Sequence, residues 1–173
     1  MIPSLDKIIS IGFFLKRKNS WDISEIEIRP LIWGDSARVL AWRNDVDTRR
    51  MSKSGAEINP SDHQKWFCRK LFSPFFWGFV GINHRAPFGI CFIEVSLRES
   101  VNEISININP ARRSQGLGQH LLRLSINEIK KFNNFSFKAE VKKQNARSLS
   151  LFFSQGFEEF EDNENTWTLV RDF

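Results

Sequence analysis

The stretch best suited to chemistry is the basic, glycine-containing segment Arg112–Gln119. It follows an alternating run, Glu103–Asn109, that predicts a strand, and it leads into a helical pattern. Gly116 and Gly118 allow the backbone to turn sharply and to approach a ligand closely. Free amides and the positive dipole end at the start of a helix favour phosphate oxygens, and the arginines of the segment add charge. The segment therefore predicts an anion cradle at a strand-to-helix turn.

Two common phosphate-binding patterns do not fit this cradle. A dinucleotide fingerprint needs G-x-G-x-x-G with an acidic residue about 20 positions further on, and a Walker loop needs Gly-Lys followed by Ser or Thr. The segment contains neither. Because glycines also serve in turns that bind nothing, a purely structural turn stays an alternative at this point.

The elements that must position the cradle form a mixed α/β pattern in one domain. Alternation and turn residues predict strands over 25–31, 75–83, 88–95, 103–109, 135–141, 157–161 and 166–170. Periodicity predicts helices over 35–42, 61–71, 116–132 and 145–153, with a loop over 51–60. Asp35 and Ser61 are the expected caps of the first two helices. We expect a single domain over 25–173, preceded by an N-terminal extension over 1–24.

Composition narrows the class of protein. The chain has 173 residues, of which 41% are hydrophobic, enough to fill one core and too many for a disordered chain. A net charge of +5 favours anionic partners. Cys68 and Cys91 have no metal-ligand spacing, so we expect no metal site and no disulfide framework.

The same composition guides the expected location and partners. The apolar run over 8–15 is far shorter than the roughly 20 residues that a membrane span needs. The Lys and Arg residues are scattered over several elements, and no aromatic-basic RNA motif is present. We therefore expect a cytoplasmic protein with neither a membrane nor a nucleic acid as partner.

Two motifs resemble the GNAT superfamily of N-acetyltransferases. Arg113-Ser-Gln-Gly-Leu-Gly118 matches the acetyl-CoA signature R/Q-x-x-G-x-G/A, and it lies between a strand and a helix, as it does in that family. The segment Asn145–Phe157 is similar to the family's N-x-x-S/A-x-x-x-Y-x-x-x-G-F element. The order of predicted elements also resembles the family core over about 25–171. The resemblance implies a GNAT fold, with a mixed central sheet of six or seven strands, a splayed strand pair and flanking helices.

The resemblance further implies acetyl-CoA as co-substrate, held between the splayed strands 103–109 and 135–141. Backbone amides over 113–119 are expected to hold the pyrophosphate, and strand residues to pair with the pantetheine arm. The cofactor contacts implied in this way are Ile106, Asn107, Ile108, Arg113, Ser114, Gln115, Gly116, Leu117, Gly118, Gln119, Asn145, Ser148 and Phe152.

The sequence departs from the family at the general acid. The family commonly has a Tyr four residues before the final Gly of the second motif, where this chain has Phe152, and the chain contains no Tyr at all. CoA thiolate is a fair leaving group, comparable to a thiol of pKa about 8.5, so water or a backbone donor could suffice. For the general base, the resemblance favours Glu103, with Glu94 and His63 as alternatives.

The acceptor side is indicated by a polar-aromatic segment with WRND at 42–45, RRM at 49–51 and HQKWF at 63–67. This segment resembles a subgroup that acetylates amino-sugar nucleotides in pseudaminic-acid, other nonulosonic-acid and surface-polysaccharide biosynthesis. Arginine forks suit a diphosphate, and an aromatic ring suits a sugar or uracil face. The acceptor contacts implied are Trp42, Arg43, Asn44 and His63.

The predicted reaction is direct attack of a primary amine on acetyl-CoA in a ternary complex, the amine being that of a UDP-linked amino sugar. Two alternatives stay open: an acetyltransferase of protein N-termini, and a module that binds CoA or another partner without catalysis. A homodimer formed through the aromatic run Phe75–Trp77 is a further possibility, although these rings could equally belong to the core.

Overall fold

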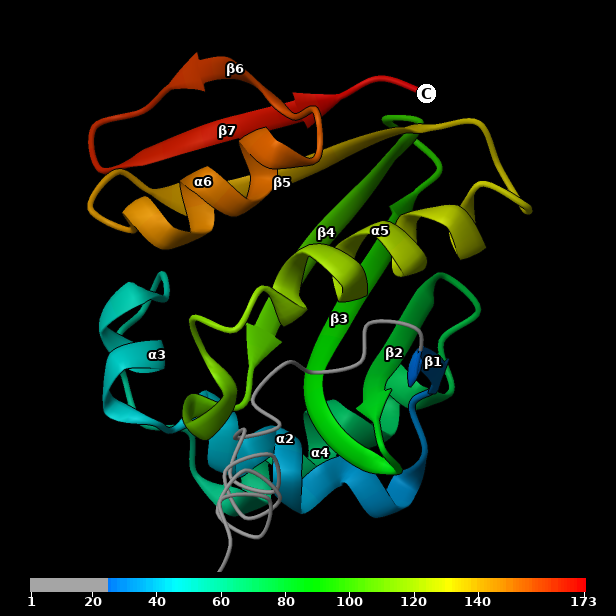
Figure 1. Cartoon of the computed structure of the whole chain (residues 1–173), viewed down its shortest axis with the longest axis vertical. Helices are drawn as coiled ribbons and strands as arrows, with labels where there is room; N and C mark the ends of the chain where they lie inside the picture. Colours follow the sequence, from blue (N-terminus) through cyan, green and yellow to red (C-terminus); the bar gives the residue numbers. More distant parts are fainter. Residues whose placement is uncertain (1–24) are drawn as a thin grey trace, which may run out of the picture.

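Residues 25–173 are described by a computed structural model, in which one mixed seven-stranded sheet carries helices on both faces (Figure 1). In sheet order, the strands are β1 (Ile26–Pro30), β2 (Phe76–Asn83), β3 (Ala86–Ser96), β4 (Val101–Ile108), β5 (Ser136–Lys142), β7 (Thr166–Arg171) and β6 (Glu158–Asp162). The helices are α2 (Ser36–Arg43), α3 (Val46–Met51), α4 (Pro60–Leu71), α5 (Leu117–Ile129) and α6 (Ala146–Ser154), with short 3-10 turns η2 (Trp33–Asp35) and η3 (Pro110–Arg112). The predicted mixed α/β sheet is confirmed, whereas the predicted extension over 1–24 lies outside the described residues. Among residues 25–173, no helix is both long and apolar enough to cross a membrane.

Two apolar cores lie on opposite faces of the sheet, because strand side chains alternate between the faces. On one face α5 packs with α6 against the strands, and it contributes the fully buried Leu121, Leu122 and Ile126. On the other face α2 and α4 cover β2 and β3, with Val39 and Phe67 as their buried contacts. The sheet is therefore held from both sides, and β4 lies at its centre.

The parallel pair β4 and β5 separates after a short contact. Only Val101–Glu103 pairs with Ser136–Lys138. Beyond this point β4 continues along β3 to Ile108, while β5 continues along β7 to Lys142. The predicted splayed pair is thus confirmed.

The helix α3 is absent from the sequence-based prediction. None of its six residues is buried, so no apolar stripe marks the helix in the sequence. Its start is instead fixed by Asp45, whose side chain accepts a hydrogen bond from the Thr48 amide at 3.0 Å. The polar break expected at Asn44-Asp45 is therefore a helix start.

The caps of the first two predicted helices also differ from expectation. Asn59 caps α4 by accepting from the Ser61 amide at 2.9 Å, so Ser61 lies inside the helix. Asp35 makes no side-chain cap to α2. An Asn before a Pro at the first helical position competes well as a cap, which explains the shift at α4.

Asp35 has a buried structural role instead. Its two carboxylate oxygens accept hydrogen bonds from Arg29 of β1 at 2.7 and 2.8 Å, and it also accepts from Arg38 and from the Ile32 amide. Burial by itself raises the pKa of Asp35, but the hydrogen bonds and the charge of Arg29 outweigh it, so the pKa is below its ordinary value. The carboxylate therefore joins β1 to the start of α2.

Replacing Asp35 with Asn should lower the free energy of unfolding by about 3 kcal/mol, since the variant removes one partner from a buried charge cluster. Urea unfolding at neutral pH measures this loss. The control Asp62→Asn, in the exposed first turn of α4, should cost less than about 1 kcal/mol.

The decrease in the free energy of unfolding caused by Asp35→Asn should also depend on pH. Because the folded-state pKa of Asp35 lies below the ordinary 3.8, its stabilisation is complete above that value and disappears as the pH falls through the folded pKa. The difference between parent and variant should thus be constant above about pH 5 and shrink below about pH 4. A difference that grows in acid would contradict this account.

Candidate active site

The loop between β4 and α5 holds its backbone in a conformation suited to an anion. Ser114 (φ 61°) and Gly116 (φ 75°) both adopt the left-handed conformation, and apart from its chain neighbours no atom of the described residues lies within 4 Å of the position that a Cβ on Gly116 would occupy. Gly116 is the N-cap of α5, and no side chain of the described residues caps this helix. The amides and the dipole of its first turn are thus suited to an anion, with Gln115 and Gln119 exposed beside them. The loop is thus suited to an anion such as a diphosphate.

Leu117 and Gly118 can contribute to this cradle only through their backbone. The Leu117 side chain is buried in the core. A Cβ on Gly118 would lie 3.3 Å from Leu151 Cδ2 and 3.7 Å from Ile108 Cγ1. The two glycines therefore act differently: Gly116 permits the turn, and Gly118 lets α5 begin close to both β4 and α6.

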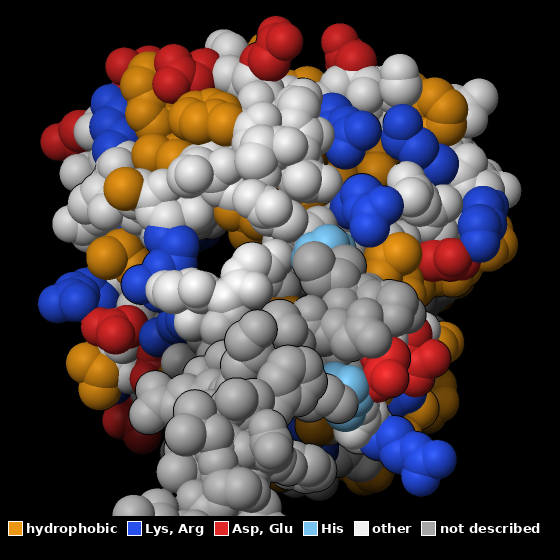
Figure 2. Space-filling model, in the orientation of Figure 1, with side chains coloured by type: hydrophobic (Ala, Val, Ile, Leu, Met, Phe, Trp, Pro, Cys, Tyr) orange, Lys and Arg blue, Asp and Glu red, His pale blue; other side chains and the backbone are white. Residues whose placement is uncertain are grey.

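A cleft opens next to this loop where β4 and β5 separate. Ile106, Asn107 and Ile108 lie beyond the last β4–β5 pair, and among the described residues only β3 pairs with this part of β4. Figure 2 shows the surface hollowed between α6 and the loop ahead of α5. A strand edge of this kind can pair with an extended ligand that carries amides, such as a pantetheine arm.

The α6 side of the cleft differs in part from the prediction. Asn145 accepts a hydrogen bond from the Ser148 amide at 3.1 Å and so caps α6, and both residues are partly exposed. Phe152, in contrast, is only 2% exposed and packs edge-on against Phe157, with 4.9 Å between ring centroids. The ring is enclosed in the core, which does not favour the predicted contact of Phe152 with the cofactor, and that contact stays a prediction.

Glu103 lies at the last paired position of β4, where the two strands separate. Its carboxylate is exposed and lies 3.5 Å from Lys138 Nζ, which is also 3.5 Å from Glu99. Burial lowers the pKa of Lys138, but the two carboxylates more than compensate and raise it, so this lysine stays charged. Glu94, the alternative base, is opposite Glu103 on β3 and forms an ion pair with Lys70.

His63 was predicted as an acceptor contact and as an alternative base, and the structure gives its ring a buried, structural environment that favours neither role. Its side chain is buried between α2 and α4, with Nε2 at 2.9 Å from the Ser36 carbonyl and the ring against Trp66 and Phe67. Burial lowers its pKa, only partly opposed by the hydrogen bond to Ser36. The neutral ring therefore joins two helices.

Trp42 and Asn44 also have structural contacts that the sequence did not predict. Trp42 packs against the core beneath α2 and α4. The Asn44 amide donates to the Ile58 carbonyl at 2.8 Å and accepts from the Ile58 amide at 2.9 Å. This pair of bonds fixes the loop before α4, and the acceptor contact of Asn44 stays a prediction.

Among the residues predicted to contact the acceptor substrate, Arg43 has a hydrogen-bond donor that is still available to a ligand. Burial and the nearby charge of Arg49 both lower its pKa. Arg43 Nη1 and Arg49 Nε are buried, and neither has a hydrogen-bond acceptor among the described residues, while Arg49 Nη1 donates to Glu57 at 3.2 Å. Sequence analysis placed Arg49 in the acceptor-side segment without naming it as a contact, because the sequence does not show which arginines of that segment are buried. The two guanidinium groups can together accept an anion.

The helix α3 bridges the separated strands. Thr48 Oγ1 lies 3.5 Å from Asn107 Oδ1 of β4, and Lys142 Nζ of β5 donates to the Arg50 carbonyl at 3.1 Å. Both contacts are beyond the β4–β5 pairing. This helix therefore forms a wall of the cleft.

Arg113 was predicted to add charge to the cradle, but its side chain is directed to α3. Its Nη2 donates to Asp45 Oδ1 at 2.7 Å and to Thr48 Oγ1 at 2.6 Å. The side chain is only 16% exposed. Its charge is thus largely neutralised within the protein, and only the backbone amide remains for the cradle.

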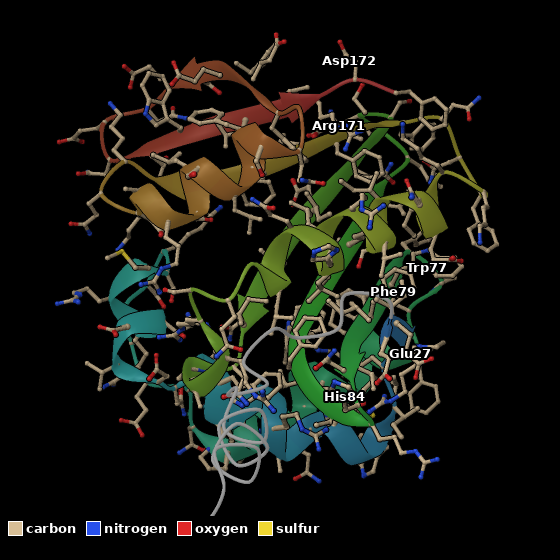
Figure 3. The ribbon with its side chains drawn as sticks, in the orientation of Figure 1. Glu27, Trp77, Phe79, His84, Arg171 and Asp172 are labelled. Carbon is tan, nitrogen blue, oxygen red and sulfur yellow. The ribbon has the colours of Figure 1, made fainter. Side chains whose placement is uncertain are left out.

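The aromatic run suggested for a dimer is mostly used inside the protein. Phe76 packs in the core under α4, and Trp77 stacks beside Phe79 and lies 4.6 Å from Phe132 by ring centroids. Figure 3 shows Trp77 and Phe79 on the side of the molecule away from α3. Of the three predicted rings only Phe75 is exposed, and the homodimer stays a prediction.

Comparison with known proteins supports an acetyltransferase fold. The family model described as "Acetyltransferase (GNAT) domain" matches residues 25–158. A ribosomal-protein-alanine N-acetyltransferase from Brucella melitensis superposes with a TM-score of 0.73 at 20% identity, covering 85% of this chain and 99% of that one. A spermidine N-acetyltransferase from Vibrio cholerae, in complex with CoA and spermine, gives 0.72 at 15% identity, covering 85% and 94%.

An aminoglycoside acetyltransferase in complex with coenzyme A also superposes with a TM-score of 0.72 at 17% identity, covering 85% of this chain and 94% of that one. A search of curated protein sequences gave no match. At these identities the structural neighbours establish the fold and leave the acceptor open.

Gly116→Ala should weaken acetyl-CoA binding about tenfold, because a non-glycine residue in the left-handed conformation costs about 1–2 kcal/mol and the loop would change shape to relieve it. No neighbouring atom obstructs the added methyl group, so the fold should survive. Calorimetric titration of acetyl-CoA measures the change.

Gly156→Ala is the matched control, since Gly156 has a similar φ of 77° but lies at the end of α6. It should lower stability and leave the dissociation constant of acetyl-CoA within about twofold. Equal binding by the parent and the Gly116 variant would mean that the loop is only a structural turn.

Proposed function

The chain belongs to the GNAT acetyltransferase family, whose co-substrate is acetyl-CoA, and from this premise we propose that its acceptor is a primary amine on an anionic small molecule, namely the amino group of a nucleotide-linked amino sugar. The assignment of the acceptor is carried by the pair Arg43 and Arg49. Buried N–H groups without hydrogen-bond acceptors lower the stability of the protein unless a ligand supplies oxygen atoms to accept their hydrogen bonds. A diphosphate offers such oxygens in a geometry that guanidinium forks match.

A lysine-lined pocket supports the same choice. It has a volume of about 350 Å³ at the end of β5, and its lining residues are Lys53, Lys142, Lys143, Gln144, Glu164 and Asn165. Lys53 follows α3 in the chain, so this pocket is lined in part by the segment next to that helix. Figure 2 shows Lys and Arg side chains on this edge of the molecule. Such surroundings favour a phosphorylated acceptor over a polyamine.

Glu103 is the proposed general base. The acceptor amine must lose a proton to attack, and Glu103 offers an exposed carboxylate where β4 and β5 separate. Neighbouring Lys138 holds this carboxylate by its charge, and Glu99 shares the same lysine. When bound, acetyl-CoA supplies the activated thioester.

The proton for the departing thiolate must come from a group other than Tyr. Phe152 has no proton to give and is enclosed in the core. Water within the cleft, or a backbone amide of its walls, is the proposed donor, and a thiolate of pKa about 8.5 needs little assistance.

Glu103→Gln should lower kcat at least about 100-fold, because the amide cannot accept the proton. Calorimetric binding of acetyl-CoA should be unchanged. Glu99→Gln is the matched control, since it removes the other carboxylate on Lys138, and it should retain at least about a third of the activity. If Glu94→Gln abolishes transfer while the Glu103 variant stays active, the base is Glu94.

Acetyl-CoA added together with UDP-linked amino sugars should release free CoA thiol, and spermidine and N-terminal peptides should release far less.

Arg43→Met, which keeps most of the side-chain volume, should raise KM for the sugar nucleotide about tenfold with little change in kcat, because a charge-assisted hydrogen bond is lost. Arg50→Met, on exposed α3 surface, is the control.

The outcomes separate the remaining alternatives. Transfer to peptides alone would favour an acetyltransferase of protein N-termini. Binding of acetyl-CoA without transfer to any amine in the panel would favour the module without catalysis.

A further inference from the structure

Arg113 connects the cofactor loop to the acceptor side of the cleft. Its side chain leaves the loop ahead of α5 and reaches Asp45 and Thr48 at the start of α3, across 68 and 65 residues of sequence. Its Nη1 also lies 3.8 Å from Asp47 Oδ2. The contact is therefore a cluster and not a single surface ion pair.

Asp45 is a strong partner for this arginine. Burial raises the pKa of Asp45, but hydrogen bonds from Arg113 and from the Thr48 amide, with the charge of Arg113, lower it on balance. The same carboxylate oxygen accepts from the Thr48 hydroxyl at 3.2 Å. Arg113 thus binds the very group that starts α3.

The helix α3 depends on such polar contacts for its position. It has six residues and buries none of them, and a helix this short is not stable by itself in water. Its described contacts to the sheet are Thr48 with Asn107, and the Arg50 carbonyl with Lys142. Removing Arg113 would leave the first turn of α3 without its charged neighbour.

We propose that Arg113 is a positioning residue that couples acetyl-CoA binding to assembly of the acceptor site. Acetyl-CoA on the loop amides fixes the backbone of Arg113, and Arg113 in turn holds α3, which carries Arg49 and walls the cleft. When one substrate orders its own site, the other substrate loses less conformational entropy on binding. Acetyl-CoA and the acceptor therefore strengthen each other's binding by the same factor. This inference rests on the proposed function for the identity of the acceptor, but its structural consequence needs no acceptor.

Hydrogen exchange of the full chain tests that consequence. In the parent protein, saturating acetyl-CoA should slow amide exchange in residues 46–52 at least about fivefold. In Arg113→Gln and in Asp45→Asn, exchange in this segment should be faster without ligand, and acetyl-CoA should no longer slow it. Arg50→Gln, whose partner Asp47 is exposed, is the control and should behave as the parent does.

Calorimetry then separates positioning from direct cofactor binding. Because the coupling is reciprocal, both variants should weaken acetyl-CoA binding by the factor by which acetyl-CoA slows exchange in the parent, about fivefold, and the double variant should resemble the single ones, because both remove one interaction. Once an acceptor is known, its KM should rise in both variants. If Arg113→Gln weakens acetyl-CoA tenfold while Asp45→Asn does not, Arg113 is a phosphate ligand and the proposal is overturned.

Unchanged exchange over 46–52 on adding acetyl-CoA to the parent would overturn the proposal as well. A failure of sugar nucleotides as acceptors would instead refute only the proposed substrate, because neither exchange nor calorimetry with acetyl-CoA involves an acceptor.

Discussion

Backbone hydrogen bonding in the sheet places a constraint on everything near the cleft. β4 pairs with β5 over Val101–Glu103 only, and then continues along β3, while no strand of residues 25–173 pairs with its other edge. Buried peptide groups need partners, so this edge is suited to water or to a ligand that carries amides of its own. At the end of β4, the glycine loop presents the start of α5 to the same space. The β4 edge that can pair with an extended pantetheine arm therefore ends at the loop that can hold an anion.

The two sides of this gap have different chemistry. On the side of α5 and α6 the surroundings are apolar and tightly packed, which fixes the loop and the strand edges. On the side of α3 the contacts are charged, and two guanidinium donors have no acceptor among the described residues. The α5–α6 side of the cleft is thus rigid and the α3 side is adaptable, because the polar contacts of a short helix rearrange at a lower free-energy cost than a packed core. Under the proposed function, the rigid side serves the co-substrate and the adaptable side serves the acceptor.

Local patterns in the sequence determined most of the fold. Strict alternation identifies β4, and helical periodicity identifies α5, whose buried face is long and apolar. The glycine positions of the loop are equally local, since a left-handed turn ahead of a helix needs Gly116 whatever packs around it. For the same reason the acetyl-CoA signature could be recognised from residue types and spacing alone.

Tertiary structure decided which polar side chains are free to act. His63 and Asn44 have residue types that suit a binding site, yet folding assigns one to a helix contact and the other to a loop, and Arg113 is taken up by α3. No apolar stripe marks α3 in the sequence, since its contacts beyond its own cap are polar and come from partners distant in the chain. The sequence by itself thus determined the strands, the longer helices, their order and the cofactor loop, because these depend on neighbouring residues. Burial, ion pairing and the N–H groups of Arg43 and Arg49 that have no acceptor among the described residues depend on which elements meet, and only the folded chain decides that.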